Sequence, residues 1–172
     1  MVALERMDLA KRRNAPILAR VVSYAFSSDG RDLAVPSGAG LEACMRDCLA
    51  RARIAKEKID YISAHATSTS VGDVVEAQAI HSLFGDNTPW ISSTKSMTGH
   101  EMWMSGASQA VYATLMGMKG FIAPNINFRK QEPTAPPLRI AAETIEMRPR
   151  YMLLNSAGFG GTNSCLLLEA GP

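Results

Sequence analysis

The sequence predicts an α/β domain in which helices pack against a layered, mixed β-sheet. Segments rich in β-branched and aromatic residues alternate with segments whose apolar residues recur at the helical period, in the order β-α-β-α-β-α-β-β. The chain has 172 residues, of which 47% are hydrophobic and 20% charged. A chain of this length buries about 70% of its unfolded surface on folding. We therefore expect a single folded domain over residues 1–172.

In the first half of the chain, two predicted strands flank a helix. Residues 1–13 are charged and can form a short helix, and residues 17–26 (ILARVVSYAF) favour a long strand that ends in a Ser-Ser-Asp-Gly turn at 27–30. Apolar residues of the segment 41–52 recur at i, i+3, i+4, i+7, i+8 and i+11, which places them on one face of a helix of about four turns. Residues 59–64 (IDYISA) favour a short second strand.

The next elements follow from capping and periodicity. Asp73 is expected to cap a helix that runs to about Phe84, with Glu76 at the spacing of a capping box. Residues 90–93 favour a brief strand, and residues 105–118 favour a helix with an apolar face. If the chain stands alone, the apolar stripe of one of its two long helices should be exposed, and we expect self-association.

The last part of the chain contains a hairpin-like pattern. A proline-containing segment at 124–137 is expected to be irregular. Residues 151–156 and 164–169 favour two strands, and a glycine-rich loop separates them.

Composition argues against several classes of protein. The 18 Lys and Arg residues and 16 Asp and Glu residues give a net charge of +2, which does not favour nucleic-acid binding driven by bulk charge. No apolar run reaches the roughly 18–20 residues that span a membrane, and no signal-peptide pattern is visible. The three cysteines, Cys44, Cys48 and Cys165, are odd in number and lack a CxxC motif. This pattern favours the reducing cytoplasm over a disulfide framework.

Three polar segments follow predicted strands, at residues 64–73, 92–100 and 155–163. Ligands of open α/β sheets bind at the carboxyl ends of strands, so these segments are candidates for a site. Each segment alone is also compatible with an ordinary structural role. The Ser and Thr runs can satisfy backbone groups, and the glycine-rich run can be a plain hairpin turn, because it lacks the Gly-Lys-Ser/Thr ending of a phosphate loop. The spacing of His65, His81 and His100 matches no local metal-ligand pattern, so no metal site is expected.

Taken together, the three segments carry a resemblance. They read His-x-Thr-Ser-Thr-x-x-x-Asp, Ser-Ser-Thr-Lys-Ser-Met-Thr-Gly-His and Asn-Ser-x-Gly-Phe-Gly-Gly-Thr-Asn, and residues 120–127 (GFIAPNIN) lie between the second and third. In this order they closely resemble the C-terminal half of the bacterial β-ketoacyl-acyl-carrier-protein synthases, types I and II. The resemblance covers almost the whole chain. It implies one half of a thiolase-like fold, with the half that bears the nucleophilic cysteine outside these residues.

The resemblance also implies a reaction and residue roles. The family performs a decarboxylating Claisen condensation in fatty-acid or related polyketide synthesis. By motif, His65 and His100 are the imidazole donors to the developing enolate oxygen. Lys95 supports this pair with its charge, and Thr67 and Thr69 hold the pantetheine arm.

The glycine-rich loop matches the gating loop of the family. Phe159 is expected to supply a main-chain N–H to an oxyanion hole and to gate the acyl pocket with its ring. The flanking Gly158, Gly160 and Gly161 would let the loop move. The implied partners are acyl carrier protein, whose phosphopantetheine arm carries the substrate, and a cysteine-bearing half, in a homo- or hetero-oligomer. No tightly bound cofactor is implied.

Two departures from the family matter. The first is that no cysteine of this chain matches the family's nucleophile: Cys44 and Cys48 lie on an apolar helix stripe and Cys165 in a strand, so we interpret all three as structural. Gln109 stands where a carboxylate is usual, which leaves Lys95 with one counter-charge fewer.

Three interpretations of the chain follow. It is half of a split synthase that is inactive alone, a non-catalytic scaffold that binds carrier protein or pantetheine, or part of a longer enzyme.

Overall fold

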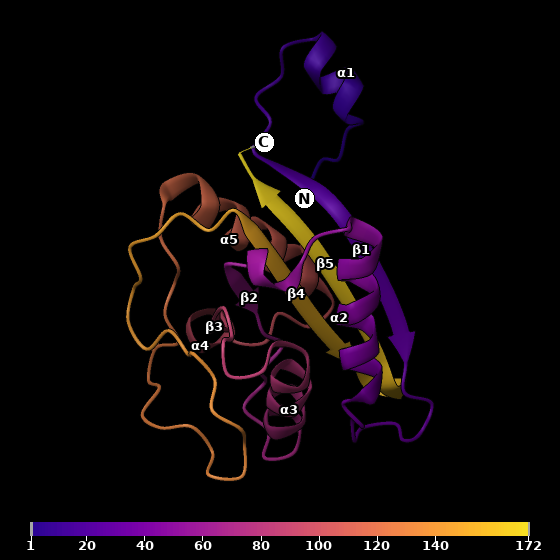
Figure 1. Ribbon diagram of the computed structural model, residues 1–172, viewed down its shortest axis with the longest axis vertical. Helices are drawn as coiled ribbons and strands as arrows, with labels where there is room; N and C mark the ends of the chain where they lie inside the picture. Colours follow the sequence, from indigo (N-terminus) through magenta and orange to yellow (C-terminus); the bar gives the residue numbers. More distant parts are fainter. Residues whose placement is uncertain (1, 172) are drawn as a thin grey trace.

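The computed structural model describes residues 2–171 and contains a five-stranded mixed sheet (Figure 1). The strands are β1 (Ala19–Ser28), β2 (Tyr61–Ser63), β3 (Trp90–Ser92), β4 (Tyr151–Gly158) and β5 (Thr162–Ala170). Their order across the sheet is β1-β5-β4-β2-β3, with β5 antiparallel to both β1 and β4, and β2 parallel to both β4 and β3. The predicted α/β class with a mixed sheet is confirmed.

Helices cover both faces of this sheet. The helices of the chain are α1 (Met7–Arg12), α2 (Ala39–Ala52), α3 (Gly72–Phe84), α4 (Lys95–Thr98) and α5 (Ser105–Lys119), with 3₁₀ turns η1 (Lys56–Lys58), η2 (Met102–Met104) and η3 (Phe159–Gly161). Of these, α1 stands apart from the sheet (Figure 1). In Figure 1, α2 lies over β1 and β5, while α5 lies on the opposite side of the sheet. The segment between α5 and β4 is irregular apart from isolated bridges, as its prolines predict.

The two faces bury separate cores because side chains alternate along each strand. Leu153 of β4 packs into the core beneath α2 and α3, whereas its neighbours Met152 and Leu154 pack with Met116 of α5. The parallel strands β2 and β3 are short and lie between these layers. Their carboxyl ends, and that of β4, therefore open at one edge of the sheet.

The predicted apolar stripe of α5 faces away from the sheet. Val111, Leu115 and Met118 are 40%, 43% and 38% exposed. The face toward the sheet carries mostly small residues beside Gln109 and Met116, and Gly117 lies so close to Ala170 that a Cβ at position 117 would stand 2.2 Å from the Ala170 Cβ. Glycine at position 117 thus lets the helix approach β5 closely, while Val111, Leu115 and Met118 remain on its outer side.

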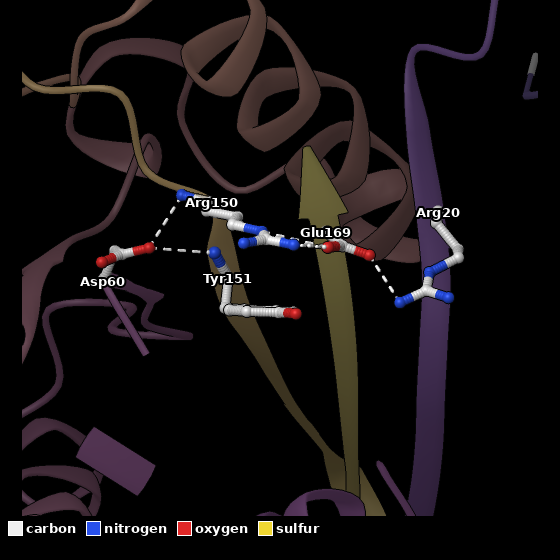
Figure 2. A network of polar contacts seen from close by, with 5 residues as sticks. All are labelled: Arg20, Asp60, Arg150, Tyr151 and Glu169. Carbon is white, nitrogen blue, oxygen red and sulfur yellow. Dashed lines mark hydrogen bonds and ion pairs between the residues drawn. The ribbon is translucent and has the colours of Figure 1, made fainter. Parts of the chain in front are cut away.

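At the edge of the sheet away from these carboxyl ends, polar groups join four elements (Figure 2). Glu169 of β5, with a side chain only 4% exposed, pairs with Arg150 at 2.8 Å and with Arg20 of β1 at 2.5 Å. Asp60, just before β2, accepts main-chain N–H bonds from Arg150 and Tyr151 at 2.8 and 3.0 Å. This network holds the starts of β2 and β4 in register with the end of β5.

The predicted N-cap of α3 is wrong. The helix begins at Gly72, and the hydroxyl of Thr69, not Asp73, accepts the Gly72 N–H at 3.2 Å. Asp73 instead accepts the main-chain N–H of Thr69. Glu76 does not return to the helix start, because its side chain turns inward to the end of β2.

The first strand also differs from its prediction. β1 extends to Ser28, since Ser27 and Ser28 pair with Asn163 and Thr162 instead of forming a turn. Pairing with a long neighbouring strand here overrides the local turn signal.

Candidate active site

The three polar segments singled out in the sequence meet at the carboxyl ends of β2, β3 and β4. They line two adjoining cavities of about 880 and 660 Å³. The polar side chains common to both linings are Thr67, Thr69, Asp73, Glu76 and His100, while Lys95 lines the larger cavity and His65 and Phe159 the smaller. The tertiary structure therefore brings the residues of the three motifs into one place.

His65 and His100 form a ring pair at this place. Their ring centroids are 5.7 Å apart and the planes lie at 84° to each other. His65 follows β2 and is half-buried, whereas His100 follows α4 and is exposed. Two imidazoles at this separation can direct N–H groups to one ligand atom between them.

A main-chain hydrogen bond determines which nitrogen of the His100 ring carries the proton. Its Nδ1 accepts the N–H of Met102 at 2.9 Å, and the Ser105 hydroxyl lies 3.3 Å from the same nitrogen. Met102 adopts a positive φ of 51° at this turn. Because Nδ1 is an acceptor, the proton of the neutral ring lies on Nε2, so this nitrogen is the free donor.

His65 has a different environment. Burial, together with the neighbouring charges of Lys95 and His100, lowers the pKa of His65 to about 4. Its ring is therefore neutral at pH 7. Within residues 2–171 its buried Nδ1 has no hydrogen-bond partner. The ring is thus held by packing and by its main chain.

Lys95 opens α4, directly after β3, and its side chain turns inward. Within the described chain its buried Nζ lacks a hydrogen-bond partner. Burial lowers the pKa of Lys95, and the carboxylates of Glu76, Glu101 and Asp73 oppose that effect. The ammonium group is therefore available to a ligand in the larger cavity, and it acts on His65 through its charge.

Glu76 belongs to this site although the sequence reasoning did not place it there. Its carboxylate accepts the main-chain N–H groups of His65 at 2.9 Å and Ala66 at 2.8 Å. Burial raises the pKa of Glu76, while these N–H groups and the Asn155 amide oppose the rise. Ala66 has a positive φ of 24° at this turn. A carboxylate on the otherwise apolar buried face of α3 was the available signal.

The proposed pantetheine ligands lie on the rim of both cavities. Thr67 is half-buried and Thr69 exposed. The Thr69 hydroxyl accepts the Gly72 N–H and keeps its own proton free to donate. Both hydroxyls are accessible to a ligand that enters along the rim.

The glycine-rich loop is the turn of the β4–β5 hairpin. Phe159 is 78% exposed beside the smaller cavity, with Gly158 and Gly161 also in its lining. Gly160 and Gly161 adopt φ of 79° and 71°, and a Cβ on Gly161 would approach the Asp29 Cβ to 2.9 Å. Glycine is therefore required at position 161 by both its backbone conformation and its close packing.

The three cysteines are core residues, as predicted. Cys44, Cys48 and Cys165 are free, at most 1% exposed, and line neither cavity. Burial raises the pKa of Cys44 to about 11 and that of Cys165 well above its usual value. A hydrogen bond with Cys165 lowers the pKa of Cys48 to about 7, but this thiol is fully buried. None is placed as a nucleophile of the site.

Between residues 2 and 171, no group of three or more His, Cys, Asp and Glu side chains stands together in a way that could hold a metal ion. In the same range no helix has the length and apolar character needed to cross a membrane.

The chain is similar to known proteins over almost its whole length. Residues 18–129 match the model of the family described as beta-ketoacyl synthase, C-terminal domain. The chain is 43% identical to 3-oxoacyl-[acyl-carrier-protein] synthase 1 of Escherichia coli K12 over 98% of its length and 41% of that protein. It also superposes with a TM-score of 0.94 on a beta-ketoacyl synthase from Burkholderia phymatum STM815, at 33% identity, covering 98% of this chain and 41% of the other.

A third likeness is to a polyketide ketosynthase solved with its acyl-carrier protein and a bound hexaketide, AntDE:AntF. The TM-score is 0.91 at 29% identity, and the alignment covers 98% of this chain and 42% of that one.

The fold thus defines a domain with a thiolase-like architecture. The chain belongs to the β-ketoacyl synthase family, in which it corresponds to the C-terminal domain and is similar to type I synthases. It spans about two fifths of the length of the curated relatives it matches.

Proposed function

We propose that this chain supplies the electrostatic part of a 3-oxoacyl-acyl-carrier-protein synthase, with His65, His100 and Lys95 as its catalytic residues. The observation that carries the proposal is the His65–His100 ring pair, 5.7 Å between centroids, beside the buried Lys95 ammonium. The reaction is a decarboxylating Claisen condensation between an acyl thioester and a malonyl group on carrier protein.

The chemistry needs such donors at one oxygen. When the malonyl thioester loses CO₂, the electron pair of the broken C–C bond delocalises onto the thioester oxygen as an enolate. The N–H groups of His65 and His100 stabilise that oxygen, and Lys95 adds positive charge nearby. The carbanion then attacks the acyl carbon, and the bond to the sulfur of a cysteine breaks to release a thiolate. That cysteine belongs to a half of the enzyme outside this chain.

The substrate carrier is proposed to enter along the threonine rim. Thr67 and Thr69 would hydrogen-bond the phosphopantetheine arm, and acyl carrier protein would be the docking partner. The ketosynthase solved with its acyl-carrier protein supports this choice. Phe159, flanked by Gly158, Gly160 and Gly161, would gate the acyl pocket and offer its N–H in the acyl-transfer step. No tightly bound cofactor takes part.

The exposed apolar side chains support a partner that covers them. Val111, Leu115 and Met118 of α5 form one outward stripe, and Trp103, just before the helix, is 99% exposed. We propose that the cysteine-bearing half packs on this surface, in a homo- or hetero-oligomer. The three free thiols support a location in the reducing cytoplasm.

Complementation tests the proposal. The chain would be co-expressed with the cysteine-bearing half of a type I synthase, and malonyl-carrier-protein decarboxylation and condensation would be measured. His65→Ala and His100→Ala should each lower the rate by about 10²–10³-fold, the usual effect of losing one oxyanion donor. His81→Ala, outside both cavities, is the matched control.

Two outcomes would redirect the assignment. A complemented complex that binds acylated carrier protein without turnover supports the scaffold function. One observation favours that alternative: among the described residues, no cysteine lines either cavity. Covalent acyl uptake by the isolated chain, on Cys165 for example, would show that a cysteine assigned here as structural is a nucleophile.

A further inference from the structure

The side chain of Gln109 lies where two strands of the site separate. The parallel pairing of β2 with β4 ends at Ser63 and Leu154. Beyond it, Ala64 leads directly to His65, while Asn155 continues in β4 toward the hairpin turn with Phe159. Gln109, on α5, is 4% exposed and reaches this point from the face of the sheet opposite α2 and α3.

Its amide satisfies the groups that the separating strands leave unpaired. Nε2 lies 3.2 Å from the Ala64 carbonyl, 3.1 Å from the Asn155 carbonyl and 3.1 Å from the Ser63 hydroxyl, and these three acceptors share its two hydrogens. Oε1 accepts the Ser156 hydroxyl at 2.9 Å. The Ala64 and Asn155 carbonyl oxygens can only accept hydrogen bonds. The Gln109 amide must therefore be oriented with its NH₂ group, and not its oxygen, toward them.

The contacts continue from Gln109 to the imidazole site. Asn155, whose carbonyl Gln109 binds, donates its side-chain amide to the Glu76 carboxylate at 3.3 Å. Glu76 in turn accepts the main-chain N–H of His65 at 2.9 Å. All four residues of this path are buried or half-buried, where an unsatisfied polar group costs about 1–3 kcal/mol.

We infer that Gln109 is a positioning residue, which sets the separation between the His65 end of β2 and the Phe159-bearing end of β4. The inference rests on the proposed function for its catalytic meaning, although the geometry can be tested without turnover. An ionised carboxylate, as the resemblance leads one to expect at this position, could not donate to the two carbonyls. The buried counter-charge for Lys95 comes from Glu76 instead.

The test uses the full chain and NMR. Gln109→Met keeps the shape and removes every hydrogen bond, and Gln78→Met, at an exposed glutamine of α3, is the matched control. The measurements are the thermal midpoint, the amide shifts of residues 64–67 and 156–161, and the pKa of the His65 ring. Ser156→Ala removes a single contact and serves if Gln109→Met does not fold.

Gln109→Met should lower the thermal midpoint and shift both groups of amides. It should also raise the His65 pKa by about one unit, a tenfold change in proton affinity, because the ring loses its buried position. Ser156→Ala should move the same signals less, and the control should move none. Gln109→Glu should resemble Gln109→Met at pH 8 and return toward the parent in acid, because only the protonated acid can donate.

A lowered midpoint with unchanged His65 titration and unchanged amides would reduce Gln109 to a purely structural residue and overturn the inference. The same holds if Gln109→Met is unfolded and Ser156→Ala leaves His65 unaffected. These readouts need no partner half, so failure of the complementation assay and failure of this inference are separate results.

Discussion

Glu76 holds the main chain of His65, whose N–H donates to the Glu76 carboxylate at 2.9 Å. The second carboxylate oxygen accepts the N–H of Ala66, at a positive φ, so one buried side chain shapes the whole turn that presents the imidazole. Because the His65 Nδ1 has no hydrogen-bond partner among residues 2–171, the ring depends on such support for its position.

Glu76→Gln should therefore destabilise the protein. One carboxylate oxygen becomes an NH₂ group that faces a main-chain N–H, and the lost bond is expected to lower the free energy of unfolding by about 1–3 kcal/mol. Urea denaturation measures this difference. Glu57→Gln, at an exposed glutamate of η1, provides the comparison. Equal stabilities for the two variants would contradict the assigned contacts.

The lowered pKa of His65 predicts a pH dependence of stability. The folded state holds the ring neutral down to about pH 4, whereas an unfolded histidine takes up its proton near 6.5. Between these values the unfolded chain binds more protons, so stability falls as pH falls from 6.5 to 4. His65→Gln should flatten this part of the stability profile, measured by denaturation at several pH values. His81→Gln supplies the comparison, and a profile equally steep in His65→Gln would count against the assignment.

Lys95→Met should raise the pKa of His65, since it removes a positive charge that opposes protonation of the ring. NMR titration of the ring protons measures the change. Lys119→Met, at the far end of α5, should leave the titration in place. A His65 pKa that does not rise in Lys95→Met would show that burial alone controls this imidazole.

The Glu169 network predicts a second, acidic pH dependence. Burial raises the pKa of Glu169, but its bonds to Arg150 and Arg20 outweigh this effect and lower it overall. The network therefore contributes stability above the unfolded pKa, and this contribution is lost as pH falls through the lower folded value. Glu169→Gln should reduce the free energy of unfolding at pH 7 by about 1–3 kcal/mol, because bonds to charged groups are lost while the arginines remain partly hydrated.

Denaturation at pH 7 and near pH 3 measures both parts of this prediction, with exposed Glu143→Gln as the control. The difference between Glu169→Gln and the parent should shrink at the lower pH. A constant difference would mean that packing, not charge, accounts for the effect.

The exposed stripe of α5 predicts self-association of the isolated chain. Sedimentation velocity should show oligomers whose fraction grows with concentration, and Leu115→Glu should shift the distribution toward monomer. Leu4→Glu, at an exposed leucine before α1, is the control for added charge. A concentration-independent monomer in the parent chain would remove this support for a covering partner.

Much of the fold is predictable from the sequence because its signals are local. The apolar period of residues 41–52 predicts a helix, and the β-branched run in β1 predicts a strand; both signals lie within a few neighbouring residues. The motifs with His65, Lys95 and His100 likewise identify the family before any contact is known. Two local predictions are wrong. The turn at Ser27 and Ser28 gives way to pairing with β5. The capping box from Asp73 to Glu76 does not form, because Glu76 turns inward to the main chain of His65.

The sequence by itself determined the elements, the family and the residue types of the site. Only the tertiary structure decided which of those residues meet. The T-shaped approach of His65 to His100 and the path from Gln109 through Asn155 to Glu76 join segments far apart in the chain. Such contacts depend on where the sheet ends and how closely α5 approaches β5 at Gly117. These are properties of packing between elements, and no local pattern of residue types encodes them.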